Sequence, residues 1–197
     1  MMGQQLFDLV LGTLAQAFTA VLWLRVLMQA QRISFYTPLG RFVLALTDWA
    51  VLPLRRILKP RMRWDAVSLG LVWATQSLFV LLKMALFGQL ALLPLGGLIG
   101  LVVLGGLLES FYVLGYLLFF AVLFAAVLSW VNPRAPAAAI AEAIVAPWLE
   151  PIRRVVPVIA GIDLSPLVFL LLLQVLAIAG GQLRFLLVRL LLGGGLG

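Results

Sequence analysis

Two pairs of adjacent arginines are the residues of this chain best suited to binding a ligand. Pro53-Leu54-Arg55-Arg56 returns 98 residues later as Pro151-Ile152-Arg153-Arg154. Guanidinium groups donate several hydrogen bonds in one plane and bind phosphate oxygens bidentately. The first pair begins a basic cluster that continues with Lys59, Arg61 and Arg63. We predict contact with anionic lipid or a partner protein; the alternative is that the arginines only anchor the topology or pair with a nearby carboxylate.

Two aspartates stand at matching places, again 98 residues apart. Asp65 precedes the second long apolar stretch, and Asp163 precedes the last one. Asp163 is followed by Ser165 and Pro166, the order of a capping residue and a first-turn proline at a helix start. We predict that Asp65, Asp163 and Ser165 cap helices, or that the aspartates pair with the arginines. A ligand or ion site built from both aspartates is the sharper alternative.

Two glutamines also recur at this offset. Gln76 and Gln174 fall in the middle of apolar stretches, where an amide bonds to a neighbouring helix. We predict a polar contact between the two halves of the chain, and as a second possibility the lining of a polar pathway. Arg25, Lys83 and Glu109 lie near the ends of apolar stretches, where we expect their side chains to extend toward the interface.

Missing residue types exclude most catalytic and metal chemistry. The chain has no cysteine and no histidine, and so lacks thiolates, the commonest general base and the commonest metal ligand. Its glycines form no phosphate-binding motif; Gly105-Gly106 and Gly180-Gly181 instead favour close helix approach. We expect no enzyme activity, no cofactor and no metal. The hypothesis that the protein handles haem or a metal is weakened, because methionine is the one soft ligand left.

The composition predicts a membrane protein. Hydrophobic residues make up 64% of the 197 residues and charged residues only 11%, with a mean hydropathy of +1.19. Soluble domains have roughly 45–50% apolar and about 25% charged residues. The net charge of +7 then indicates the positive-inside rule and anionic lipid, and no nucleic-acid partner.

Four stretches are long and apolar enough to span a bilayer, which takes about 20 residues. They cover residues 6–28, 66–88, 105–130 and 165–190. The uncharged stretch 84–108 could hide a fifth span, but Pro94 and several glycines favour a turn and an interfacial segment there. We therefore predict an all-α membrane protein with four spans.

The repeat divides the chain into two tandem helical hairpins, residues 1–98 and 99–197. Both polar stretches between spans, 29–65 and 131–164, then lie on one side of the membrane and both termini on the other. The excess of arginine and lysine in 29–65 predicts that this side is cytoplasmic.

Each polar stretch contains a short apolar stripe at helical spacing. Phe42, Leu46 and Ala50 follow Pro38, and Ile140, Ile144 and Trp148 follow Pro136. The spacing predicts an amphipathic helix in the membrane interface, its apolar face toward the acyl chains. A helix packed on the ends of the bundle is the alternative, which the alanines around Ala141 favour for the second copy.

Three motifs in the second half, in this order, resemble the signature of the YggT/YlmG family. They are Ser129-Trp130-x-Asn132-Pro133, Glu150-Pro151-x-Arg153-Arg154 and Gly161-x-Asp163-x-Ser165-Pro166. Arg25-x-Leu27, Pro38, Pro53-x-Arg55-Arg56 and Asp65 are similar to a more diverged first copy. The resemblance covers essentially the whole chain. It implies a multi-pass protein of the bacterial plasma (inner) membrane, with roles in osmotic tolerance, cell division, envelope organisation or, in plastids, cofactor assembly on a cytochrome.

Two classes of function follow. The first is a non-enzymatic accessory or scaffold protein whose basic loops contact anionic lipid and whose spans dock against a membrane protein partner. The second is a small channel or transporter subunit in ion or osmotic homeostasis, with a pathway past Gln76 and Gln174. Four spans with so few polar residues leave no wetted pore in one chain, so the second class requires a homo-oligomer.

Overall fold

The structure is a computed structural model that describes residues 2–57, 65–88, 90, 94–132, 134–156 and 163–193. Those residues form helices and connections and include no strand. The elements are α1 (Met2–Phe7), the π-helical turn η1 (Asp8–Gly12), α2 (Thr13–Ala30), α3 (Pro38–Ile57), α4 (Ala66–Leu86), α5 (Leu95–Val131), α6 (Pro136–Arg153) and α7 (Ser165–Gly193). The predicted all-α class is confirmed.

Four of the helical segments are long and apolar enough to cross a membrane. They are Met2–Ala30, Ala66–Leu86, Leu95–Ser129 and Ser165–Leu191. The prediction of four spans is confirmed for the described residues, and the first span includes α1, η1 and α2 without a break. The protein is therefore an all-α membrane protein.

The connection between the second and third spans differs from the prediction. The turn follows α4 at Phe87 and Gly88, where Gly88 has a φ of 69° that favours glycine. Pro94 then stands at the N-cap of α5, and the glycines expected to make an interfacial segment are helical. An uncharged apolar run satisfies its backbone by staying helical in hydrocarbon, so α5 begins ten residues before the predicted span.

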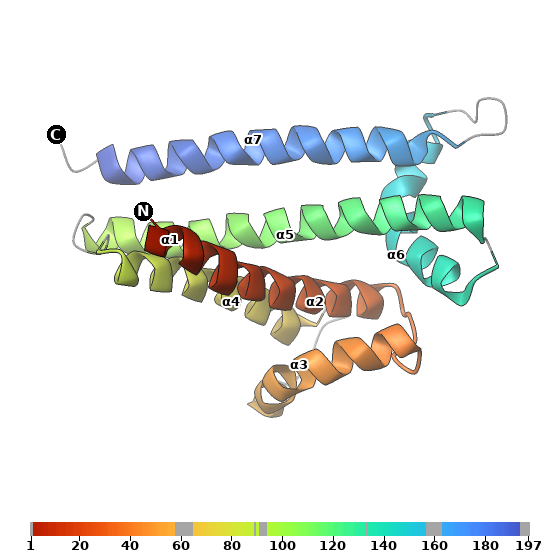
Figure 1. The fold of residues 1–197 in the computed structure, drawn as a ribbon, viewed down its shortest axis with the longest axis horizontal. Coiled ribbons are helices and arrows are strands. Elements are labelled where there is room, and N and C mark those ends of the chain that lie inside the picture. Colours follow the sequence, from red (N-terminus) through yellow and green to blue (C-terminus); the bar gives the residue numbers. More distant parts are fainter. Residues whose placement is uncertain are drawn as a thin grey trace.

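α5 lies at the centre of the molecule (Figure 1). It packs against α4 and α2 on one side and against α7 on the other, and α6 crosses its C-terminal end. α3 and α6 lie toward one end of the bundle, whereas α1 and the last turn of α7 lie at the other. We call α3 and α6 the elbow helices. They begin 98 residues apart, at Pro38 and Pro136.

Two apolar clusters join the elbow helices to the spans. Val51 of α3 packs with residues of α2 and α4, among them Leu22 and Val72. Val145 and Leu149 of α6 pack with residues of α5 and α7. Each elbow helix is thus fixed to the hairpin in which it lies.

The contact between α4 and α5 joins the two hairpins at a glycine. A Cβ atom on Gly106 would lie 2.7 Å from Cα of Ser77, whereas one on Gly105 would meet nothing within 4 Å. The prediction of close helix approach is confirmed for Gly106 and wrong for Gly105. Nearby, the indole N–H of Trp73 donates to the carbonyl oxygen of Val103 at 3.0 Å, which also holds α4 against α5.

Candidate functional site

Asp65 is the centre of the first elbow. It stands at the N-cap of α4, and its side chain accepts hydrogen bonds from the backbone N–H and the hydroxyl of Ser68. The guanidinium of Arg55, from α3, donates to the same carboxylate and to the amide oxygen of Gln29 at 3.2 Å. The side chain of Asp65 is fully buried. One carboxylate therefore caps a span and holds the elbow helix against it.

A second arginine lies under this contact. Arg25 of α2 is 2% exposed and donates to Thr47 and, at 2.7 Å, to Asp48 of α3. Its Nε lies 3.9 Å from Asp65. The prediction that Arg25 extends toward the interface is wrong, because two carboxylates from the first elbow keep it inside the protein.

The charge state of Asp65 follows from these contacts. Burial alone would raise the pKa of the carboxyl, but the hydrogen bonds from Ser68 and the adjacent Arg55 guanidinium outweigh it and hold the pKa below its ordinary value of 3.8. Asp65 is therefore an anion at neutral pH, as an ion pair with two arginines requires.

The second elbow repeats the main contact in a more open setting. Arg153 of α6 donates to Asp163 at 2.9 Å and to Glu142 at 2.7 Å, and Asp163 accepts from the backbone N–H of Ser165 at the start of α7. Burial alone would raise the pKa of the Asp163 carboxyl. The hydrogen bonds from Ser165 and Arg153 outweigh burial and hold the pKa below its ordinary value of 3.8. The Arg153 side chain is 37% exposed and that of Asp163 35%. We call Arg55–Asp65 and Arg153–Asp163 the elbow staples; each joins residues ten apart.

The staples change how the arginine pairs are interpreted. Arg55 and Arg153 are engaged by carboxylates, as the alternative interpretation held. Arg154 pairs with Glu150 at 3.1 Å, with both side chains largely exposed.

Arg56 is exposed and, among the described residues, has no hydrogen-bond or ion-pair partner. Lys59, Arg61 and Arg63 lie outside the described residues. Lipid contact stays a prediction, and Arg56 is the arginine of the pairs best placed for it.

The aspartates do not form one shared site. Each lies in its own elbow with its own arginine, so the structure keeps the two apart. Ser165 is buried, and it is Asp163, not Ser165, whose side chain accepts the hydrogen bond at the start of α7. Among the described residues, no group of three or more carboxylates is placed to hold a metal ion.

The glutamines are also separated. Gln76 is 2% exposed, and its amide donates to Thr19 of α2 at 3.0 Å. That bond lies within the first hairpin, so the prediction of a contact between the hairpins is wrong for Gln76. Gln174 is exposed on α7. The counterpart of Thr19 at the 98-residue offset is Leu117, whose side chain accepts no hydrogen bond.

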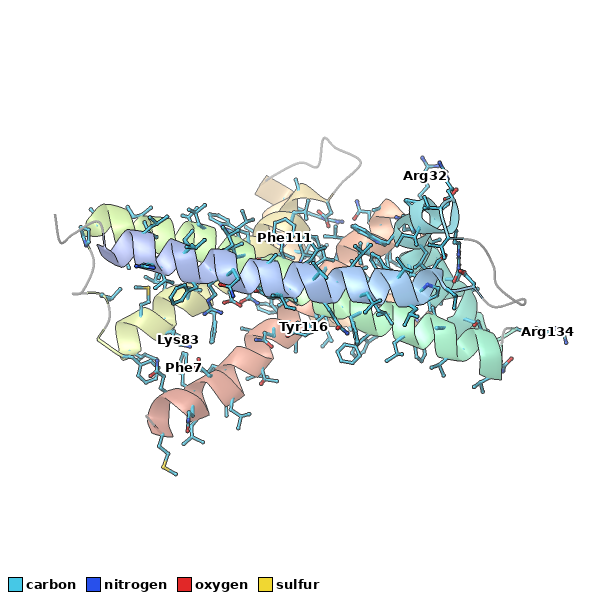
Figure 2. All side chains as sticks on the ribbon, turned by 90° about the horizontal axis from the view of Figure 1, so that it is seen from above. Phe7, Arg32, Lys83, Phe111, Tyr116 and Arg134 are labelled. Atoms are coloured by element: carbon cyan, nitrogen blue, oxygen red, sulfur yellow. The ribbon has the colours of Figure 1, made fainter. Side chains whose placement is uncertain are left out.

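Sequence reasoning missed an ion pair between the two spans of each hairpin. Lys83 pairs with Asp8 at 2.8 Å, and Arg184 pairs with Glu109. In both pairs an acid on the first span meets a base on the second, 75 residues later along the chain. The common separation of 75 residues was a signal in the sequence that could have predicted these pairs. A search at the fixed offset of 98 misses it, because the matching residues of the two pairs lie 101 residues apart. In Figure 2, Lys83 lies toward the end opposite Arg32 and Arg134.

The two elbow helices differ in the apolar face that they leave uncovered. α3 buries Val43 and Val51, while Phe42 is 55% exposed and Trp49 is 70% exposed. The centroid of the Trp49 ring lies 5.4 Å from that of Phe18 on the first span, so the exposed face of α3 lies beside that span. On α6 the stripe residue Ile144 is buried and Trp148 is only 37% exposed. The bundle-packed alternative therefore describes α6 better than α3.

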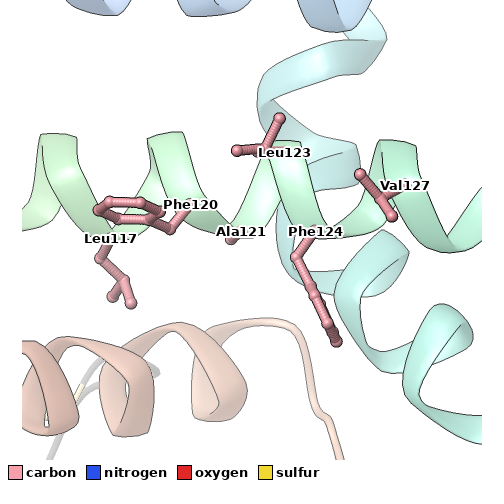
Figure 3. A pocket seen from close by; sticks show the side chains of 6 residues that line it. All are labelled: Leu117, Phe120, Ala121, Leu123, Phe124 and Val127. Atoms are coloured by element: carbon pink, nitrogen blue, oxygen red, sulfur yellow. The ribbon is translucent and has the colours of Figure 1, made fainter.

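An apolar pocket of about 500 Å³ lies on α5 near the elbows (Figure 3). Six side chains line it: Leu117, Phe120, Ala121, Leu123, Phe124 and Val127. This lining offers no hydrogen-bonding or titratable side chain, so it suits a hydrocarbon chain and not a polar substrate.

Comparison with known proteins agrees with the motifs. The family model CCB3/YggT matches residues 4–89 and 104–183. The chain belongs to this family. The two matched segments lie on either side of the α4–α5 connection and the first turns of α5.

Relatives cover most of the chain. It is 32% identical to the protein YggT of Escherichia coli strain K12 over 84% of each chain. It is 34% identical to an uncharacterized protein of Vibrio alginolyticus over 83% of this chain and 87% of the relative. A Haemophilus influenzae protein is 30% identical over 84% and 86%. No solved structure matches the chain.

Proposed function

We propose that the protein is a non-catalytic accessory protein of the bacterial plasma membrane. In this proposal its first elbow helix lies in the interface, facing the cytoplasm, and contacts anionic lipid. The end of the bundle that carries α3 and α6 offers a docking surface for a membrane protein complex, in keeping with the roles in osmotic tolerance, division or complex assembly that the resemblance implies. One observation carries the proposal: α3 leaves an apolar face open beside the first span and ends in an exposed arginine.

The apolar face supports an interfacial position. Phe42, Leu46, Trp49 and Leu52 are all at least 40% exposed, although the opposite face of α3 packs tightly on the bundle. Leaving a large apolar side chain in water costs about 1.5–3 kcal/mol relative to burying it. Acyl chains would cover these four side chains, and the contact of Trp49 with Phe18 turns them toward the hydrocarbon.

The charges beside this face support anionic lipid as the ligand. Arg41 is exposed near the start of α3, and Arg56 is exposed near its end. Positions 42, 46, 49, 53 and 56 fall on one side of a helix of 3.6 residues per turn, so Arg56 continues the apolar stripe. A guanidinium group at the level of the headgroups binds phosphate.

The test is the lipid selectivity of the protein in bilayers. We expect Arg56→Gln to lower the preference for phosphatidylglycerol over phosphatidylcholine about fivefold, since one cation near an anionic surface contributes about 1 kcal/mol. Spin-labelled lipids report that preference directly. Arg134→Gln is the matched control, because it removes an exposed cation near α6, whose apolar stripe is less exposed than that of α3. Equal losses in the two variants, or none in either, would contradict lipid binding by α3.

Flux measurements separate this proposal from the transport alternative. The described residues place Gln76 inside the first hairpin and Gln174 on the outer face of α7, so one chain does not bring them to a common pathway. We expect liposomes that contain the protein to conduct ions and small solutes no faster than empty liposomes. Flux that Gln76→Leu abolishes would contradict the accessory role and favour a channel or transporter subunit.

A further inference from the structure

α7 is the least covered of the four spans. In its most apolar stretch 6% of the residues are buried, compared with 22–28% in the other three spans. It packs against α5 along one side and against α6 at its start, and Figure 1 shows it at the edge of the bundle. A wide face of α7 is therefore free to meet lipid or another protein.

That face carries a polar group in mid-span. Gln174 lies nine residues into α7 and is exposed. Within the part of the chain that the structure describes, nothing bonds to its amide, whereas the counterpart Gln76 donates to Thr19. Acyl chains offer no hydrogen bonds, so an amide among them is stabilised by a polar partner on another helix.

The residues around Gln174 form a regular seam. Leu167, Leu171, Gln174, Ile178, Gly181 and Phe185 are separated alternately by four and three residues, and all six are exposed. Apolar residues at this spacing are the interface of a left-handed helix pair, and one polar residue within such a seam fixes its register. The next position in this alternation is Val188, which is partly buried, so the seam ends at Phe185.

We propose that two copies of the protein associate through this seam, with the two Gln174 amides bonded to each other. Two copies inserted in the same orientation have parallel α7 helices, so each Gln174 meets its counterpart at the same depth. An amide has both donors and an acceptor, and the pair is therefore self-complementary about a twofold axis. The interface goes beyond the proposed lipid contact of α3 and does not depend on it.

Crosslinking tests the geometry. The chain has no cysteine, so single cysteines report one position each. We expect Ile178→Cys to form a disulfide-linked dimer readily in native membranes. The matched control is Leu176→Cys, which is similarly exposed at nearly the same depth but lies well off the seam. Equally fast crosslinking at the two positions would show random collision and overturn the proposal.

Association measurements test the amide pair. We expect fluorescently labelled protein in vesicles to show energy transfer that falls as lipid dilutes it. Gln174→Leu should weaken the association about tenfold, a factor that corresponds to about 1.4 kcal/mol, and Gln174→Asn should retain most of it. Parent protein that stays monomeric at every dilution, or Gln174→Leu that associates like the parent, would overturn the proposal. Circular dichroism of each variant confirms that it is folded.

Discussion

The two elbows use the same staple in different surroundings. In the first, the Asp65 carboxylate is fully buried, with Arg55 and Arg25 beside it. In the second, Asp163 and Arg153 are more than a third exposed, and Glu142 shares the arginine. Burial makes a charged contact costly to break, because the remaining partner is left unpaired away from water. One duplicated motif thus holds the first elbow through buried charge and the second mainly through apolar packing of α6.

Removing the aspartates should give the largest difference between the elbows. We expect Asp65→Asn to lower the free energy of unfolding by about 3–5 kcal/mol, because the buried Arg25 and the partly buried Arg55 lose the negative charge beside them. Asp163→Asn should cost less than about 1 kcal/mol, as exposed ion pairs do. Unfolding in mixed micelles titrated with dodecyl sulfate measures both. Equal losses would show that burial does not distinguish the two staples.

Replacing Arg25 and Asp48 by the residues at their matching positions should make the first elbow resemble the second. The residues 98 positions after Arg25 and Asp48 are Leu123 and Ala146. We expect Arg25→Leu alone to cost about 3 kcal/mol, since it leaves Thr47 and Asp48 without their donor. The double variant Arg25→Leu with Asp48→Ala should recover at least half of that loss in the same titration. If the double variant lost more unfolding free energy than the two single variants together, the ion pair between Arg25 and Asp48 would not explain the cost of Arg25→Leu.

A glycine substitution tests the packing that joins the two hairpins. Gly106→Ala places a methyl group against the backbone at Ser77, so α4 and α5 must separate, at a cost of about 1–3 kcal/mol. Gly105→Ala is the matched control on the same helix, and it should be neutral or slightly stabilising because alanine favours helix. Thermal unfolding followed by circular dichroism compares them. A larger loss of thermal stability in Gly105→Ala than in Gly106→Ala would show that α4 and α5 do not meet at Gly106.

Acid should weaken the first staple. The folded pKa of Asp65 lies below its ordinary value of 3.8, so the stability that it contributes is fully present above about pH 4 and is lost as the pH falls through the folded pKa. We expect the difference in stability between the parent and Asp65→Asn to be constant from pH 5 to 8. It should narrow below pH 4. A difference that narrows above pH 5 would contradict the lowered pKa.

Much of the fold follows from hydropathy and helix caps. Apolar length predicts the four spans, and Asp65, Asp163 and Pro136 stand where helices begin. The start of α5 could not be predicted in the same way. Glycine and proline mark turns in water, but an uncharged run that contains them also forms a helix in hydrocarbon, where backbone groups have no other partners.

The site was predictable where the repeat preserved it. The repeat keeps the arginine and the aspartate of each staple ten residues apart in both copies, and pairing of the arginines with a carboxylate was one of the two interpretations. Arg25 and Asp48 have apolar counterparts, so no duplicated signal indicated their contact. The exposure of Gln174 depends on how α7 sits against α5, which no local pattern encodes.

The depth of α3 in the bilayer is the most direct test of whether this helix lies in the interface. Single nitroxide labels at residues 42, 46 and 49, introduced through cysteines, report contact with oxygen in hydrocarbon and with a water-soluble nickel complex. We predict that all three labels meet oxygen more readily than nickel, and that a label at residue 41 meets nickel more readily. Labels at 42, 46 and 49 that are freely reached by nickel would place the apolar face of α3 in water and contradict the account.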